Sequence, residues 1–368
     1  MNRSIRFVAA AGVFALAMGL PFPHEGDLLR GQAAPQSSQF QVDPFWPKPL
    51  PNDWVTGNVG GTCVDKNDHV FIVNRTADAT NLTPAEKEVG RAAPPVIEFD
   101  PEGNVVNSWG DFKIVPNGIH DCYFDPEGNI WIGGNADAIA QKYSRDGRLL
   151  LQIGVKKQFD TADGSQKAAA LNASHTLLNR PASFAVDPAN GEVYIADGYG
   201  NRRVAVFDRE GKYVRQFGRQ ATKEEAEANV GGAFLGIVHC VVLSNDGLIY
   251  VCDRDGRRIQ VFDKAGSFKK NIFIKRRRAD LPGNGSPWWI HLSHDPAQKT
   301  MYVADGVNEV IWTLDRASGQ AQAGFGTLGH MAGEFTFLHT ITMNSKGDLF
   351  IGETVGGRRV QKFNAVGN

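Results

Sequence analysis

The sequence has no long hydrophobic run after its first twenty residues, and it has no excess of charge of either sign. Its 39 Lys and Arg residues nearly balance 40 Asp and Glu residues, which leaves a net charge of −1. Nucleic-acid binding usually needs a basic surface, so this balance argues against such a partner. No later segment is long and apolar enough for a transmembrane helix. We therefore expect no nucleic-acid partner and no membrane contact beyond the N-terminal segment.

Cysteine is scarce, and no two cysteines have the CxxC spacing of a redox or zinc motif. All of them lie in apolar, strand-like runs, where buried free thiols are common. The four are Cys63, Cys122, Cys240 and Cys252. Buried free thiols are the favoured interpretation. A bridge between Cys63 and Cys122, on neighbouring inner strands of the fold inferred below, is the alternative.

The N-terminal segment has the order of parts that is typical of a secretory signal peptide. Arg3 and Arg6 precede the apolar stretch 7–20, which is too short to favour a membrane span. A small-x-small cleavage site follows at 31–33. We predict that residues 1–33 are a signal peptide and leader, and that the protein is exported to the periplasm or the exterior. An uncleaved anchor is the alternative.

The sequence contains an internal repeat. A short apolar strand, an Asp or Asn, a Gly-containing turn and an aromatic-rich strand recur together, as in 122–135 and 184–198. Turns such as DPEG, DREG and NSKG favour tight hairpins. The residues that open these turns mark six copies, 49 to 62 residues apart: Asp65, Asp125, Asp187, Ser244, Asp295 and Asn344.

Units of four short strands at this spacing are typical of propeller blades. We therefore predict an all-β fold, a six-bladed β-propeller over residues 39–368. The last copy ends with its third strand at 358–363, and the stretch 39–47 can supply its missing outer strand and close the ring. Two connections depart from the pattern. A capping residue, proline and glutamate at 83–86 predict a helix start, and the polar segment 155–178 predicts a surface loop or lid.

Histidines occupy one column of the repeat. The residue five positions before each turn-opening residue begins the innermost strand, where side chains face the central channel. In blade order this column reads Gly60, His120, Ala182, His239, Ile290 and His339. Alternate blades lie about 120° apart in a six-bladed ring, so the three imidazoles should converge on the axis. Three histidines with a fourth position open are a catalytic zinc set. Channel histidines that only bind water are the alternative.

The loops after the second strand of each blade should return to the histidine face. They carry Arg75, Tyr199 and Arg254 on blades one, three and four. Arginine can hold a carboxylate through two parallel hydrogen bonds, and tyrosine near a metal can act as a general base. Solvated loop residues are the alternative. Residues that recur by blade are interpreted as structural: Arg202, Arg203, Arg257, Arg258, Arg358, Arg359, Asp197, Asp253 and Asp305.

At these residues the sequence resembles peptidyl-α-hydroxyglycine α-amidating lyase, an NHL-repeat propeller family. The similarity covers roughly residues 50–365 and is strongest over 180–218 and 238–262. The resemblance implies an NHL six-bladed propeller that releases an amide and glyoxylate. The site residues it implies are the zinc ligands His120, His239 and His339, the catalytic Tyr199, and the substrate-binding Arg75 and Arg254.

One position departs from the family. The resemblance implies a structural calcium on the backbone carbonyls of Thr62 and Cys122 and on an aspartate, but Thr340 stands at the aspartate position. A hydroxyl is a weak calcium ligand without a carboxylate nearby. We therefore expect weak or absent calcium binding, although Asp121 could compensate.

The leading interpretation is a zinc-dependent lyase that cleaves the C–N bond of an α-hydroxyglycine-type substrate. We expect a small-molecule or peptide substrate with a carboxylate, and a monomeric protein. The alternative is a non-catalytic NHL propeller that binds a peptide or small ligand at the same mouth, because fold alone does not decide function. A calcium-dependent hydrolase fits less well, because its channel would need several carboxylates.

Overall fold

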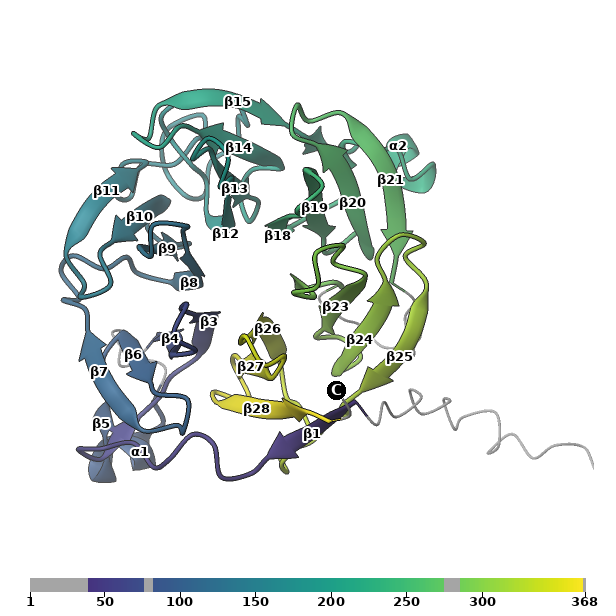
Figure 1. The fold of residues 1–368 in the computed structure, drawn as a ribbon. Helices are drawn as coiled ribbons and strands as arrows, with labels where there is room; N and C mark the ends of the chain where they lie inside the picture. Colours follow the sequence, from purple (N-terminus) through teal and green to yellow (C-terminus); the bar gives the residue numbers. More distant parts are fainter. Residues whose placement is uncertain (1–38, 76–81, 275–284, 367–368) are drawn as a thin grey trace, which may run out of the picture. The chain divides into compact units, whose positions relative to one another are not determined.

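The computed structural model describes residues 39–75, 82–274 and 285–366. The predicted signal peptide and leader at 1–33 lie outside these residues. Six four-stranded antiparallel sheets are arranged around a central axis, each with one strand next to the channel (Figure 1). The predicted six-bladed, all-β propeller is confirmed.

The first three blades follow the chain outward from the axis. Blade one consists of β3 (Val59–Val64), β4 (Val70–Asn74), β6 (Val96–Phe99) and β7 (Val105–Trp109). Blade two consists of β8 (Ile119–Phe124), β9 (Ile130–Gly134), β10 (Ile139–Tyr143) and β11 (Leu149–Ile153). Blade three consists of β12 (Pro181–Val186), β13 (Val193–Asp197), β14 (Arg203–Phe207) and β15 (Tyr213–Phe217).

The next three blades repeat this order. Blade four consists of β18 (Val238–Leu243), β19 (Leu248–Asp253), β20 (Arg258–Asp263) and β21 (Phe268–Phe273). Blade five consists of β22 (Trp289–Leu292), β23 (Thr300–Asp305), β24 (Val310–Asp315) and β25 (Ala321–Phe325). Blade six consists of β26 (Leu338–Met343), β27 (Leu349–Glu353), β28 (Val360–Ala365) and the N-terminal β1 (Phe40–Asp43).

Blade six closes the ring by joining distant parts of the chain. Strand β1 pairs antiparallel with β28, with Phe40 opposite Ala365 and Asp43 opposite Lys362. The predicted closure is therefore confirmed, over a shorter stretch than 39–47. This pairing covers the edge of β28 and makes β1 the outer strand of blade six, so the two ends of the chain join in one sheet.

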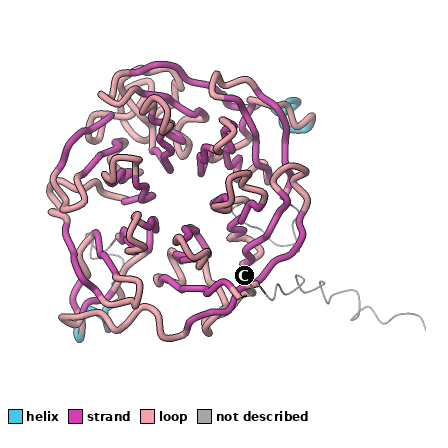
Figure 2. The backbone as a smooth tube through the Cα atoms, viewed as in Figure 1, coloured by secondary structure: helices cyan, strands magenta, loops and turns pink. Residues whose placement is uncertain are grey.

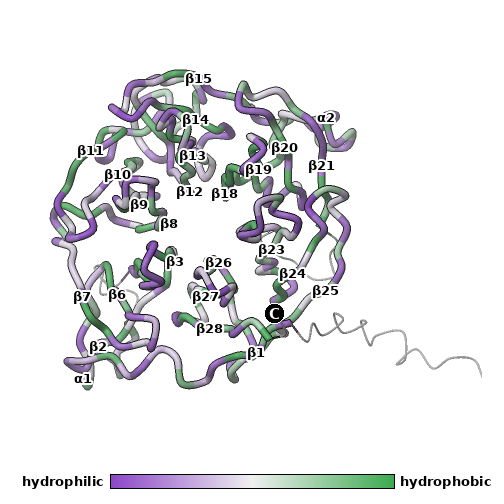
Figure 3. Tube along the Cα trace, viewed as in Figure 1, coloured by the Kyte–Doolittle hydropathy of each residue, from purple (hydrophilic) through white to green (hydrophobic). Residues whose placement is uncertain are grey.

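Burial follows the position of each strand within its blade. The second strands β4, β9, β13 and β27 are buried along their whole length, whereas the outer β11 and β15 are exposed or half-buried except at their last residue. Figures 2 and 3 show strands in every blade and hydrophobic stretches along them, not one central hydrophobic body. The core is therefore a set of layers between neighbouring blades.

Short elements decorate the connections. The predicted helix is α1 (Pro84–Val89), and Thr83 and Glu86 form its capping box. A second helix, α2 (Lys223–Glu227), has a capping box from Thr222 and Glu225 that the sequence analysis missed. Two small parallel pairs are β2 (Trp54–Val55) with β5 (Arg91–Ala92) and β16 (Arg219–Gln220) with β17 (Ala233–Phe234). Among the described residues, neither helix has the length and hydropathy needed to cross a bilayer.

The expectation of free thiols was wrong, because all four cysteines form disulfides. Cys63 on β3 bonds Cys122 on β8, with Cα atoms 5.4 Å apart, as the alternative proposed. Cys240 bonds Cys252 on the paired strands β18 and β19, with Cα atoms 4.9 Å apart. The inner strands of neighbouring blades converge toward the axis, which brings Cys63 and Cys122 together. Two disulfides favour an oxidising, exported location.

The segment 155–178 forms a loop without a helix or a named strand. Its centre is the buried Asp160, whose carboxylate accepts hydrogen bonds from the backbone amides of Ala173 and Ser174. The same carboxylate accepts a 3.0 Å hydrogen bond from the side-chain amide of Asn201. The loop is therefore tied to the turn that follows β13.

Candidate metal centre at the channel mouth

Each residue of the predicted histidine column is the second residue of its inner strand. The pairing of the inner strand shifts register at or beside this position in β3, β8, β12, β18 and β26, whereas β22 pairs regularly. A bulge changes the direction in which a side chain points. All three histidine-bearing strands contain one.

The three histidines converge as the sequence predicted. His120, His239 and His339 are almost completely buried, and their candidate ligand nitrogens lie within 4.8 Å of one another. Their ring centroids are 4.8 to 5.2 Å apart, a nearly equilateral arrangement. The triad could therefore bind a metal ion.

The chemistry of the donors fits a metal. His120 Nδ1 donates to the Ala182 carbonyl at 2.7 Å, and His239 Nδ1 donates to the Trp288 carbonyl at 2.6 Å. These bonds fix the tautomer and leave each Nε2 with a lone pair. The buried Nδ1 of His339 has no hydrogen-bond partner among the described residues.

The electrostatics also favour neutral imidazoles. Burial lowers the pKa of all three histidines well below the usual 6.5, and the charges of Arg75 and Arg254 lower it further. Neutral imidazole is the form that ligates metals. A cation bound at the triad would offset the unfavourable desolvation of these polar rings.

Tyr199 lies against the triad. Its hydroxyl is 3.3 Å from His120 Nε2 and 3.0 Å from His239 Nε2, and it can donate to one of them at a time. The preceding Gly198 permits this position, because a β-carbon there would lie 2.0 Å from the Val238 carbonyl oxygen. The turn after β13 can therefore pack directly on β18, beside His239.

Arg254 lies on the other side of the same tyrosine. Its Nη1 donates to the Tyr199 hydroxyl at 3.4 Å, and its guanidinium is 4.8 Å from the Trp288 ring. The Nε of Arg254 is buried and has no hydrogen-bond partner among the described residues, although Asp255 lies 3.7 Å away. A largely buried guanidinium with unused donors can receive a carboxylate.

Arg75 lies near His120. Its Nε donates to the Ile119 carbonyl at 2.8 Å, which holds the guanidinium next to the histidine-bearing strand. The structure therefore places Arg75, Tyr199 and Arg254 at the histidine face, as predicted. The roles assigned to these three residues remain predictions.

Several residues interpreted from the sequence as structural form ion pairs, of which those of Arg203 and Arg258 are fully buried. Arg203 Nε bonds Asp197 at 2.9 Å, and Arg258 Nε bonds Asp253 at 2.9 Å. Arg359 pairs with Glu353 at the equivalent place on blade six. These pairs join the second and third strands of their blades.

Part of the mouth was not predicted from the sequence. Trp288 lies 5.6 Å from the rings of both His239 and His339, and Arg180 lies 5.4 Å from the Tyr199 ring. Both stand two positions before the histidine column in their blades. Aligning this position across the six repeats would have found them. Arg202, which was interpreted as structural, uses its Nη1 to bind the carbonyls of Gly198 and Asn201 in the tyrosine turn.

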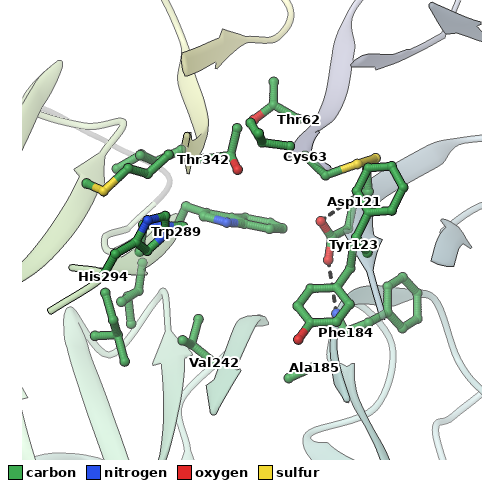
Figure 4. A pocket seen from close by; sticks show the side chains of 18 of the residues that line it. Thr62, Cys63, Asp121, Tyr123, Phe184, Ala185, Val242, Trp289, His294 and Thr342 are labelled. Carbon is green, nitrogen blue, oxygen red and sulfur yellow. Dashed lines mark hydrogen bonds between the residues drawn. A yellow bond between two sulfur atoms is a disulfide. The ribbon is translucent and has the colours of Figure 1, made fainter. Parts of the chain in front are cut away.

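The other end of the channel holds a separate cavity of about 440 Å³. Trp289 lies between the two regions, because its ring is 6.1 Å from the His239 ring and its side chain lines this cavity. Figure 4 shows Asp121 bonded to the backbone amide of Phe184, with Tyr123 nearby.

Most of the residues considered for calcium line this far-end cavity. Thr62 and Cys122 belong to its lining, and the hydroxyls of Thr62 and Thr340 are 3.1 Å apart. Asp121 accepts hydrogen bonds from the amides of Cys122 and Phe184. The expectation of weak calcium binding remains a prediction.

Comparisons with known proteins agree with this architecture. The NHL repeat model matches residues 178–207, and a model of the two component regulator propeller matches residues 113–136. A solved streptogramin B lyase superposes with a TM-score of 0.55 at 13% identity, over 89% of this chain and 98% of that one. At this identity the match supports the fold alone.

Two relatives are similar in sequence. NHL repeat-containing protein 3 of Homo sapiens is 27% identical over 232 residues, 61% of this chain and 57% of that protein. Peptidyl-alpha-hydroxyglycine alpha-amidating lyase 1 of Drosophila melanogaster is 25% identical over 270 residues, 69% of this chain and 46% of that protein. The chain thus spans about half the length of these relatives. The repeats, the fold and these matches show an NHL-repeat β-propeller with distant similarity to peptidyl-α-hydroxyglycine α-amidating lyases and to NHL repeat-containing protein 3.

Proposed function

We propose that this protein is a zinc-dependent lyase that cleaves the C–N bond of an α-hydroxyglycine-type substrate. The observation that carries the proposal is the contact of the Tyr199 hydroxyl with two of three converging histidines and with Arg254. The arrangement combines a metal-ligand set, a proton-transfer group and a carboxylate receptor within one buried site. The distant similarity to amidating lyases supports the same chemistry.

The metal would be held by His120, His239 and His339. The preference for zinc rests on the donor set, because three neutral imidazoles with room for a further ligand are typical of catalytic zinc. When bound, zinc would supply Lewis acidity toward the hydroxyl oxygen of the substrate. The remaining work of binding and proton transfer falls to the side chains of this chain.

Arg75 and Arg254 would bind the substrate carboxylate and set its orientation. Tyr199, as phenolate, would take the proton of the α-hydroxyl group. The electrons of that O–H bond form the new C=O bond, and the C–N bond breaks with its electron pair on nitrogen. The proton held by Tyr199 then passes to the nitrogen. The products are an amide and glyoxylate, and no water or oxidant is consumed.

A direct test is turnover of α-hydroxyhippurate, which carries the α-hydroxyglycine group on a benzoyl amide. The proposal predicts benzamide and glyoxylate in equal amounts, above the slow background breakdown of the substrate. Hippurate, which lacks the hydroxyl, should give neither product. Stoichiometric binding of the substrate without any release of glyoxylate by the zinc-loaded protein would instead support the non-catalytic alternative.

A further inference from the structure

The rim of the histidine mouth is chemically asymmetric. One residue on each blade stands two positions before the histidine column and directly precedes the inner strand. In blade order they are Asn58, Gly118, Arg180, Ile237, Trp288 and Phe337. Blades four to six thus present apolar side chains, with Trp288 and Phe337 rings 5.5 Å apart. Blade three presents a cation.

Arg180 is fixed at this rim by its neighbours. The Tyr199 amide donates to the Arg180 carbonyl at 3.1 Å, and Arg180 Nε donates to the Asn135 side-chain oxygen at 3.3 Å. Its backbone adopts a φ of 65°, an uncommon value for a residue with a side chain. The guanidinium lies 5.4 Å from the Tyr199 ring. Among the described residues, no carboxylate pairs with it and its two terminal nitrogens have no hydrogen-bond partner.

Further cations surround the same tyrosine. Arg254 lies 5.5 Å from the Tyr199 ring, so two guanidinium groups lie against this one side chain. Burial lowers the pKa of Arg202, the charges of Asp255 and Asp253 raise it, and the charges of Arg180 and Arg254 lower it, so the three arginines are close enough to interact.

The nearby carboxylates offset this cationic group only in part, and no ion pair joins any of them to Arg180 among the described residues. Asp197 and Asp253 bond Arg203 and Arg258 at 2.9 Å in the buried structural pairs. Asp255 lies 3.7 Å from Arg254. In the proposed function, Arg75 and Arg254 bind one substrate carboxylate. Arg180 is then a further cation in the described part of the mouth that this carboxylate does not use.

We propose that the substrate carries a second anionic group, which Arg180 binds at the blade-three side of the mouth. This inference deepens the proposed function and rests on it for the site of the first carboxylate. The chemical class is a dianion: an α-hydroxyglycine-type carboxylate linked to a second acidic group, such as an acidic side chain on the preceding residue. The apolar rim at Trp288 and Phe337 contacts the uncharged part.

The test compares binding of isosteric ligands that are not turned over. The probes are N-acetyl-Glu-Gly and N-acetyl-Gln-Gly, and the shorter pair N-acetyl-Asp-Gly and N-acetyl-Asn-Gly. All lack the α-hydroxyl, and each pair differs by one charge. Isothermal titration calorimetry on the full exported protein gives their Kd values for the wild type, Arg180→Gln and Arg180→Lys. Arg209→Gln is the matched control, because Arg209 is exposed in the turn between β14 and β15 of the same blade.

The wild type should bind at least one acidic peptide about tenfold more tightly than its amide, as expected for a charge-assisted hydrogen bond. Arg180→Gln should abolish this preference and leave the Kd of the amide peptides within about twofold. Arg180→Lys should retain part of it, and Arg209→Gln all of it. Unchanged melting temperatures would show that the variants fold.

Equal affinity of the wild type for the members of both pairs would overturn the second anionic site and leave the lyase proposal intact. A preference that survives Arg180→Gln would also overturn it. Binding of none of the four peptides would contradict carboxylate recognition at the mouth as a whole, and would count against both proposals. Conversely, a charge preference that depends on Arg180 would stand even if α-hydroxyhippurate were not turned over.

Discussion

The two ends of the channel are built from the same six inner strands but have different chemistry. The histidine mouth collects three imidazoles, Tyr199 and Arg254 around one point. The far end is a cavity lined by threonines, aromatic rings and Asp121, whose carboxylate is already bonded to two backbone amides. At the mouth, two of the imidazoles contact the Tyr199 hydroxyl, whereas at the far end Asp121 bonds backbone amides and Thr62 bonds Thr340.

The difference comes from position along the strand. At the second residue of the inner strand, the ring alternates histidine with Gly60, Ala182 and Ile290, which leaves room for three converging imidazoles. Further along the same strands, threonines and the Cys63–Cys122 disulfide meet across neighbouring blades. One repeat thus supplies a layer that could bind a metal ion and a layer that links neighbouring blades. Substituting the same residue type in each layer should show that the two layers differ in their effect on metal binding and activity.

The largest contrast should be in metal binding. His239→Ala removes one of three ligands, and we expect zinc affinity to fall by at least about a hundredfold. His294→Ala, in the far-end cavity, should leave affinity unchanged. Zinc content after dialysis, measured by mass spectrometry, checks both. Full zinc occupancy in His239→Ala would remove the triad from consideration as the metal site.

The next contrast concerns the two tyrosines of the channel. Tyr199→Phe should lower kcat on α-hydroxyhippurate by about a hundredfold with little change in KM, because it removes the proton acceptor and leaves the ring. Tyr123→Phe at the far end should keep the wild-type kcat. Steady-state release of glyoxylate measures both. A wild-type kcat in Tyr199→Phe would mean that Tyr199 only lines the pocket and does not transfer the proton.

A smaller effect is expected from the arginines. Arg254→Ala or Arg75→Ala should raise KM for a carboxylate substrate by about tenfold, in line with loss of a charge-assisted hydrogen bond. The same variants should matter much less for a substrate whose carboxylate is esterified. KM values for the acid and the ester, compared in each variant, test this. An equal loss on both substrates would mean that the arginines support the fold of the mouth.

The smallest effect is expected from calcium at the far end. Thr340 offers a hydroxyl already 3.1 Å from that of Thr62, and Asp121 is bonded to backbone amides. We therefore expect calcium to bind weakly or not at all, and to leave the melting temperature unchanged. Calorimetric titration with calcium measures this. Tight, stoichiometric calcium that survives purification would show that these residues can rearrange into a site.

Much of this organisation could be predicted from the sequence because it repeats. The turn-opening residues fixed the number of blades, and counting back five positions located His120, His239 and His339. Arg180 and Trp288 escaped because only one column was read. The disulfides were misjudged because their formation depends on how closely two strands approach, and the distance between β3 and β8 is set by the closed ring.

The loops were harder to predict than the blades. The capping box of α1 was recognised, but the equivalent box of α2 at Thr222 and Glu225 was not. The segment 155–178 was predicted only as a polar surface loop or lid. Its link to the tyrosine turn depends on the buried Asp160 and Asn201, two residues that are distant in sequence and have no repeat partner to reveal them.

The central claim is that the histidine triad holds zinc for lyase chemistry, and reconstitution tests it most directly. Metal-stripped protein is titrated with zinc while glyoxylate release from α-hydroxyhippurate is followed in the same samples. The account predicts that activity rises linearly and stops rising at one zinc per chain, and that His339→Ala shows no such rise. Two results would contradict this claim. One is glyoxylate release that does not fall when the metal is removed. The other is no glyoxylate release at any zinc ratio although zinc binds stoichiometrically.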